Sequence, residues 1–170
     1  GRGQQPPTVL FVGRLVDRKR VDRLVEACAQ LPDAGQPRLV IVGDGPARSD
    51  LEELARQTYP QTKFAGGVHG AELAPYFDTA DLFVLPGTGG LAVQEAMAHG
   101  LPVLVGKGDG TQDDLVRPEN GWVLSGDEPA ELAAALAEAL EDSQRLVEMG
   151  QASYRIVRDE ANIENMVTVF

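Results

Sequence analysis

Short apolar runs that alternate with amphipathic helical patterns constrain the fold of this chain more than any other feature. The runs are rich in Val, Leu, Ile and Phe without interruption, which is typical of strands buried on both faces. We expect strands at residues 8–12, 39–42, 62–65, 82–85, 102–105 and 121–124. Continuous apolar strands of this kind belong to parallel sheets that are covered by helices on each side.

The segments between the runs carry the helical spacing. Apolar residues from Val21 to Leu31 fall on one helix face, and Pro46 is expected at the start of the next helix. Further helices are expected over residues 91–99 and 131–141, with Ser143 capping the one that follows. The alternation predicts an α/β fold: a doubly wound, Rossmann-like parallel sheet of about six strands in the order 3-2-1-4-5-6, with helices on both faces and a helical C-terminus.

Length and composition indicate one globular domain. The chain has 170 residues, of which 43% are hydrophobic and 24% charged. We expect residues 1–7, which are rich in Gly, Gln and Pro, to be a linker or tag remnant, and residues 8–170 to form the domain. The apolar runs are far shorter than the ~20 residues of a transmembrane helix, and no secretory leader precedes them. These features predict a soluble, cytoplasmic domain.

The remaining composition narrows the classes of partner. The single cysteine, Cys28, lies on an apolar helix face and is expected in the core. A net charge of −11, from 26 acidic and 15 basic residues, argues against nucleic-acid binding. The last apolar stripe contains Ile163, Met166, Val167 and Phe170, and packs either on this core or on a second domain.

Two glycine-bearing turns are expected at the ligand-binding edge of the sheet. In the predicted strand order the crevice opens at the carboxyl ends of the first and fourth strands, where the order reverses. Gly13 and Arg14 follow the first strand, and the sequence Pro86-Gly87-Thr88-Gly89-Gly90 follows the fourth. The two turns should therefore face each other across one crevice.

Both turns have the character of anion-binding loops. If Asp17 caps the first helix, then Arg18, Lys19 and Arg20 occupy its first turn, where cations oppose the helix dipole unless an anion binds between them. Arg14 and Lys19 are the phosphate candidates, and a solvated basic loop is the plainer alternative. In the second turn the glycines expose backbone N–H groups, although a tight turn alone would also use glycine.

At these residues the chain resembles the C-terminal, donor-binding half of retaining glycosyltransferases with the GT-B fold, the large glycosyl transferases group 1 family (family 4). The resemblance runs nearly from end to end. It is carried by FVGRLVDRKRVDRLVEA (11–27), LVIVGDGPARSDLEELA (39–55), VHGAELAPYFDTADLFVLP (68–86), GLAVQEAMAHGLPVL (90–104) and NGWVL (120–124).

The resemblance implies roles for particular residues. Arg14 and Lys19 would hold the donor diphosphate and stabilise charge on the leaving nucleotide, and Glu95 would bind the donor ribose. Val68 and His69 would lie beside the nucleotide base. The remaining donor-binding positions that it implies are Gly13, Gly87, Thr88, Gly89, Gly90 and Leu91.

The resemblance also implies the reaction. A hexose would pass from a UDP-, GDP- or ADP-linked sugar to an acceptor with retention, and the acceptor would be bound by an N-terminal domain that these residues do not include. The isolated domain is then expected to transfer little or nothing. No cofactor is expected. No metal is expected either, because no Asp-x-Asp-like pair falls at the crevice and the nearest acidic pair, Asp113 and Asp114, is expected to start a short helix. A membrane-associated parent enzyme remains open.

Two positions depart from the family pattern. The family commonly has a pair of glutamates, and where Glu95 matches the second, Gly87 stands in place of the first. A carboxylate thought to contact the transferred sugar is therefore missing. Arg20 stands where the family usually has a glycine after the lysine.

Other functions are weaker alternatives. The segment Gly43-Asp44-Gly45-Pro46-Ala47-Arg48 is a partial dinucleotide-binding fingerprint, but its third glycine is Arg48 and it follows the second strand. No Walker phosphate loop or pyridoxal-binding lysine motif is present. The serious alternative is a non-catalytic nucleotide-sugar-binding or protein-interaction domain of the same fold, which Gly87 favours.

Overall fold

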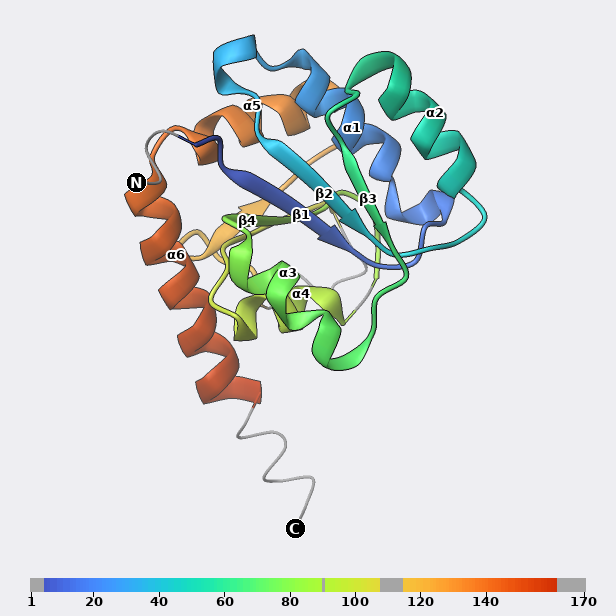
Figure 1. Cartoon of the computed structure of the whole chain (residues 1–170). Coiled ribbons are helices and arrows are strands. Elements are labelled where there is room, and N and C mark those ends of the chain that lie inside the picture. Colours follow the sequence, from blue (N-terminus) through green and yellow to red (C-terminus); the bar gives the residue numbers. More distant parts are fainter. Residues whose placement is uncertain (1–4, 90, 108–114, 162–170) are drawn as a thin grey trace.

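The computed structural model describes residues 5–89, 91–107 and 115–161, and one sheet of six parallel strands forms its centre (Figure 1). The strand order is β3-β2-β1-β4-β5-β6. The strands are β1 (Thr8–Val12), β2 (Arg38–Val42), β3 (Lys63–Gly66), β4 (Leu82–Leu85), β5 (Val103–Val105) and β6 (Gly121–Val123). The predicted sheet and its order are confirmed, and all strand pairs are parallel.

Helices cover both faces of this sheet. One layer contains α1 (Val21–Gln30), which packs against α2 (Arg48–Thr58) and α5 (Pro129–Leu140). The other layer contains α3 (Ala74–Thr79), α4 (Ala92–Ala98) and α6 (Ser143–Ile156), with α4 against α6 (Figure 1). This is the doubly wound arrangement that the alternating pattern predicts.

Burial on both faces explains the continuous apolar strands. All four residues of β4 are at most 1% exposed, as are Val9, Leu10 and Phe11 of β1. Burial of each such side chain contributes roughly 1.5–3 kcal/mol. The two strands that carry the glycine turns are thus held firmly within the core, which gives the turns a rigid base.

Two helix starts differ from the sequence prediction. Pro46 lies in a turn and α2 begins at Arg48; the Ala47 N–H donates to the carbonyl oxygen of Leu15 at 2.9 Å, which ties this turn to the segment that follows β1. At α6 the capping residue is Asp142, not Ser143. The Asp142 carboxylate accepts from the backbone N–H groups of Gln144 and Arg145 at 3.1 and 3.2 Å.

The structure bears on membrane association only through its helices. The longest described helix, α6, has 14 residues, and none in the described ranges combines the length and apolar composition of a bilayer-spanning helix. The predicted C-terminal stripe at Ile163, Met166, Val167 and Phe170 lies outside the described residues, as do Asp113 and Asp114.

Arg20 adopts a backbone conformation that favours glycine. It joins a 3₁₀ turn, η2 (Asp17–Lys19), to α1, and it is the one non-glycine residue in the described ranges with positive φ, at 57°. The Arg20 side chain contributes little stability in return. It forms an ion pair with Asp22 at 3.1 Å, but both side chains are about 40% exposed, so the pair is weak. The left-handed conformation costs roughly 1–2 kcal/mol for a residue with a Cβ.

Arg20→Gly is therefore expected to stabilise the fold. We expect a gain of up to ~1 kcal/mol, since part of the relief is offset by the larger backbone entropy that glycine has in the unfolded chain. Urea denaturation measures the change. Arg20→Ala is the matched control because it removes the same ion pair but keeps the strain, and it should not stabilise. Equal stability of the two variants would contradict the assignment of strain to Arg20.

Cys28 lies in the core, as predicted. Its side chain is fully buried, and burial raises the pKa of the thiol to about 12. We expect the folded protein to resist Ellman's reagent at pH 8, because the thiolate is the reacting species. Modification should appear only along the urea unfolding transition. Rapid labelling of the native protein would show that α1 opens locally.

Candidate functional site

The two glycine turns touch each other at the carboxyl edge of the sheet. β1 leads through Gly13 to η2, and β4 leads through Pro86 and Gly87 to α4. The Thr88 N–H donates to the carbonyl oxygen of Arg18 at 3.0 Å. A Cβ at Gly87 would lie 1.9 Å from that same oxygen, so only glycine allows this approach. The structure therefore brings together the segments from which a phosphate site was predicted.

Lys19 links the two turns through its side chain. The residue is 6% exposed, and its ammonium donates to the carbonyl oxygens of Thr88 at 3.0 Å and Gly89 at 2.8 Å. Burial is the main cause that lowers the pKa of Lys19, and the charge of Arg18 adds to it. An ammonium has three protons. Two serve the second turn, which leaves one for an anion.

The helix geometry around Lys19 differs from the prediction. α1 begins at Val21, and Arg18 and Lys19 belong to η2, so these cations do not occupy the first turn of the helix. Asp17 makes no capping hydrogen bond with its side chain. The turn forms because the Lys19 N–H donates to Val16 O at 3.1 Å and the Arg20 N–H to Asp17 O at 3.0 Å.

Arg18 lies beside the predicted phosphate site, although the sequence prediction names only Arg14 and Lys19 as phosphate candidates. Its side chain is exposed, yet its Nη1 lies 3.4 Å from the point where a Cβ of Gly89 would be, and Lys19 Nζ lies 3.6 Å from the same point. Two cationic groups thus lie close to the same point beside Gly89. The sequence does place Arg18 directly before Lys19. The position of its side chain, however, depends on the 3₁₀ turn η2, whereas the sequence pattern predicts an α-helix there.

Arg14 and Gly13 lie at the end of β1. The Gly13 N–H donates to Val42 O at 3.0 Å, which joins this turn to β2. Arg14 is exposed, and within the described ranges no hydrogen bond or ion pair ties its side chain to the second turn. No described carboxylate pairs with Arg14, Arg18 or Lys19 either. The cluster is positively charged in a chain whose net charge is −11.

The second turn continues into α4. Thr88 and Gly89 are half-buried, and Gly89 has a φ of 78°, in the left-handed region. Leu91 precedes α4 and is 75% exposed. Glu95 is exposed in the first turn of α4, and its N–H donates to Leu91 O at 3.1 Å. Gly90 lies outside the described residues.

Val68 and His69 follow β3, two strands away from β1 in the sheet. Val68 packs against the core, whereas His69 is exposed, with its Nε2 3.7 Å from the place of a Cβ at Gly67. They share the carboxyl edge with the two turns, but no described hydrogen bond connects them to Lys19 or Gly89.

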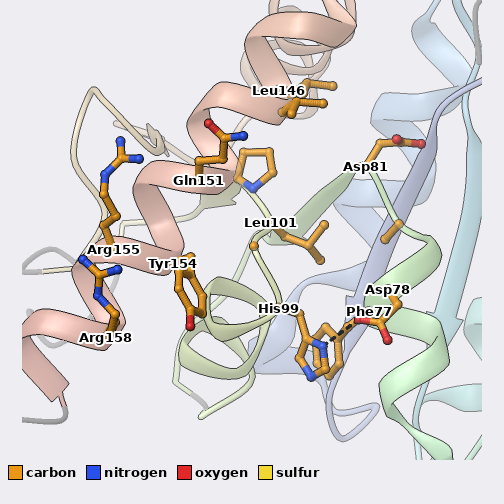
Figure 2. A pocket seen from close by; sticks show the side chains of 14 residues that line it. Phe77, Asp78, Asp81, His99, Leu101, Leu146, Gln151, Tyr154, Arg155 and Arg158 are labelled. Atoms are coloured by element: carbon orange, nitrogen blue, oxygen red, sulfur yellow. Dashed lines mark hydrogen bonds and ion pairs between the residues drawn. The ribbon is translucent and has the colours of Figure 1, made fainter.

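A separate groove of about 600 Å³ lies between α6 and the ends of α3 and α4 (Figure 2). His99 stacks on Phe77 with ring centroids 4.9 Å apart, and its Nδ1 lies 2.8 Å from an Asp78 carboxylate oxygen. Tyr154 and Arg158 of the C-terminal segment line the other wall. None of the residues predicted to bind the donor lines this groove.

Comparisons with curated proteins show close relatives. The chain is 37% identical over 153 residues to a GDP-mannose-dependent alpha-mannosyltransferase of Corynebacterium glutamicum, which covers 88% of this chain and 35% of that protein. It is 36% identical over 159 residues to a GDP-mannose-dependent alpha-(1-6)-phosphatidylinositol monomannoside mannosyltransferase of Mycobacterium tuberculosis. This match covers 86% of this chain and 41% of that protein. The chain thus spans about two fifths or less of these relatives.

Solved structures show the same architecture. Sucrose-phosphate synthase from Thermosynechococcus elongatus superposes with a TM-score of 0.85 at 28% identity, over 99% of this chain and 47% of that one. Anabaena HepE, solved in complex with UDP, superposes with a TM-score of 0.79 at 23% identity, over 99% of this chain and 51% of that one, which shows the shared fold. The family described as glycosyl transferases group 1 has a model that matches residues 1–156. The chain therefore belongs to the glycosyl transferases group 1 family.

Proposed function

We propose that this chain is the donor-binding domain of a retaining glycosyltransferase and binds a nucleotide-diphosphate sugar at the two glycine turns. The observation that carries the proposal is the buried Lys19 ammonium, which joins both turns and keeps one proton for an anion. Membership of the family supports the reaction class, and the lack of any described carboxylate partner for Lys19 supports an anionic ligand.

The chemistry follows from the charge of the leaving group. When a hexose leaves a nucleotide-diphosphate sugar, negative charge develops on the terminal phosphate. Lys19 and Arg14 would offset this charge in the transition state, a preorganised electrostatic role that needs no metal in this proposal. The backbone of Gly87, Thr88 and Gly89 would approach the phosphates, as would that of Gly13 and Gly90.

The other predicted contacts complete the donor site. Glu95 would accept hydrogen bonds from the ribose hydroxyls, with Leu91 beside it, and Val68 and His69 would border the base. An N-terminal domain joined to residues 8–170 would bind the acceptor, so this chain alone is proposed to bind donor without transferring the sugar. Because the printed names of two curated relatives contain GDP-mannose, GDP is the first nucleotide to test.

Titration calorimetry with GDP, UDP and ADP tests the proposal. We expect one of them to bind, with an affinity that falls as salt rises, because the contacts are ionic. Transfer assays with the matching sugar nucleotide should give no product from this chain alone. Failure of all three nucleotides to bind would contradict the donor-site proposal.

The alternative is a non-catalytic domain, and the contact at Gly87 favours it in one respect. The backbone of Arg18 leaves no room for a side chain where the family commonly has its first glutamate. A domain that binds nucleotide but, when joined to a functional acceptor domain of a relative, gives no transfer would favour this alternative.

A further inference from the structure

We propose that the Arg18 guanidinium binds the sugar-linked phosphate of the donor diphosphate beside Gly89, together with Lys19. This inference rests on the proposed function, since it adds a specificity-determining residue to that donor site. The sequence prediction groups Arg18 with the cations of the first turn, but it names only Arg14 and Lys19 as phosphate candidates.

The positions of the two cations carry the proposal. Arg18 Nη1 and Lys19 Nζ lie 3.4 and 3.6 Å from one point, the place of an absent Cβ on Gly89. Gly89 has a left-handed φ of 78°, so this conformation favours glycine and keeps the space between the cations free of a side chain. Two converging cations with open space between them match the several oxygens of one phosphate group.

Backbone contacts fix the position from which the Arg18 side chain extends. Its carbonyl oxygen accepts from the Thr88 N–H at 3.0 Å, and the absent Cβ of Gly87 is what admits that oxygen. The next residue, Lys19, is buried and bonded to the same turn. The Arg18 side chain is exposed, but its backbone is held in place by its own carbonyl and by the bonds of Lys19.

The charge around Arg18 lacks compensation. The neighbouring Asp17 carboxylate is exposed and does not pair with Arg18, and no other carboxylate in the described ranges does so. The charge of Arg18 also lowers the pKa of Lys19, although burial is the larger cause. An anion between the two cations would remove this repulsion. A planar guanidinium also recognises phosphate oxygens in a bidentate manner, which the point charge of lysine does not.

Calorimetry on three proteins tests the inference: the wild type, Arg18→Gln and Arg38→Gln. Arg38 is the matched control because it is exposed at the start of β2, at the opposite edge of the sheet, and its loss changes the net charge equally. Each protein is titrated with GDP, UDP and ADP and with the corresponding monophosphates, and its thermal melting is recorded to confirm folding.

Arg18→Gln is expected to weaken diphosphate binding by about 10- to 100-fold, as loss of a charged hydrogen bond does, and monophosphate binding by less than about threefold. Arg38→Gln should change neither. Unchanged diphosphate binding by Arg18→Gln, or an equal loss for both ligand types, would overturn the inference while leaving the proposed function intact. Absence of nucleotide binding by the wild type would overturn both.

Discussion

Lys19→Met is expected to weaken nucleotide-diphosphate binding by at least ~100-fold. The methionine keeps the buried aliphatic stem but removes the charge and all three donors, so the phosphate loses a charge-assisted hydrogen bond. The carbonyl oxygens of Thr88 and Gly89 also lose their shared partner, and the second turn loses the contact that holds it against η2. Titration calorimetry with the best-binding nucleotide measures the effect.

Lys63→Ala is the matched control for this substitution. Lys63 is exposed on β3, and its ammonium lies 5.9 Å from the centre of the Tyr76 ring, a contact worth ~1 kcal/mol or less. Its loss should leave nucleotide affinity within about twofold of the wild type, since a single exposed charge acts weakly at a distance. Near-normal binding by Lys19→Met would remove Lys19 from the site.

Gly87→Ala is expected to be among the most damaging substitutions in the chain. Its Cβ would lie 1.9 Å from the carbonyl oxygen of Arg18 and 2.5 Å from the carbonyl carbon of Lys19. Both are backbone atoms, so no side-chain rotation relieves the overlap and the turns must separate. We expect a loss of about 3 kcal/mol, at the upper end of overpacking costs, and a fall in Tm of about 6–12 °C.

Gly35→Ala shows what the same methyl group does without a clash. Gly35 ends a short 3₁₀ turn, and a Cβ there would meet no atom within 4 Å. Its melting temperature should stay within about 2 °C of the wild type, as for most surface substitutions. Calorimetric scans give the melting temperatures of the two variants. A Gly87→Ala protein with the melting temperature of the wild type would contradict the close contact.

The same contact predicts the result of restoring the family's glutamate. Gly87→Glu would place a longer side chain on the same blocked Cβ, so it should separate the turns and weaken nucleotide binding instead of restoring activity. Binding can be measured by calorimetry next to Gly87→Ala. A Gly87→Glu protein that binds as well as the wild type would show that the turns open at little cost.

The strands could be predicted because burial dictates their apolar composition, and their order follows from the connection rules of doubly wound sheets. β4 is apolar at every position since helices cover both sides of it, and few other environments select such a run. α3 was not predicted, because it is short and Phe77 is its one fully buried residue, too little to make a helical period visible. α2 begins two residues after Pro46, and the turn before it is held by a hydrogen bond from Ala47 to the distant Leu15, which local spacing does not reveal.

The candidate site was only partly predictable for the same reason. The glycines after β1 and β4 indicate that the two turns meet at the carboxyl edge of the sheet, since the ends of parallel strands share that edge. The carbonyl partners of Lys19 and the direction of Arg18 depend on how two turns dock, about 70 residues apart in the chain, as the Lys19–Gly89 separation of 70 shows. Local spacing does not encode such contacts.

The most direct test of the central claim is a map of backbone amide shifts by NMR during titration with GDP, UDP or ADP. A shared diphosphate site predicts that the first turn, from Gly13 to Lys19, and the second turn, from Gly87 to Glu95, shift together with one dissociation constant. The chemical shifts of the Phe77, His99 and Tyr154 amides, around the separate groove, should stay unchanged. Shifts confined to one turn, or centred on that groove, would contradict the account.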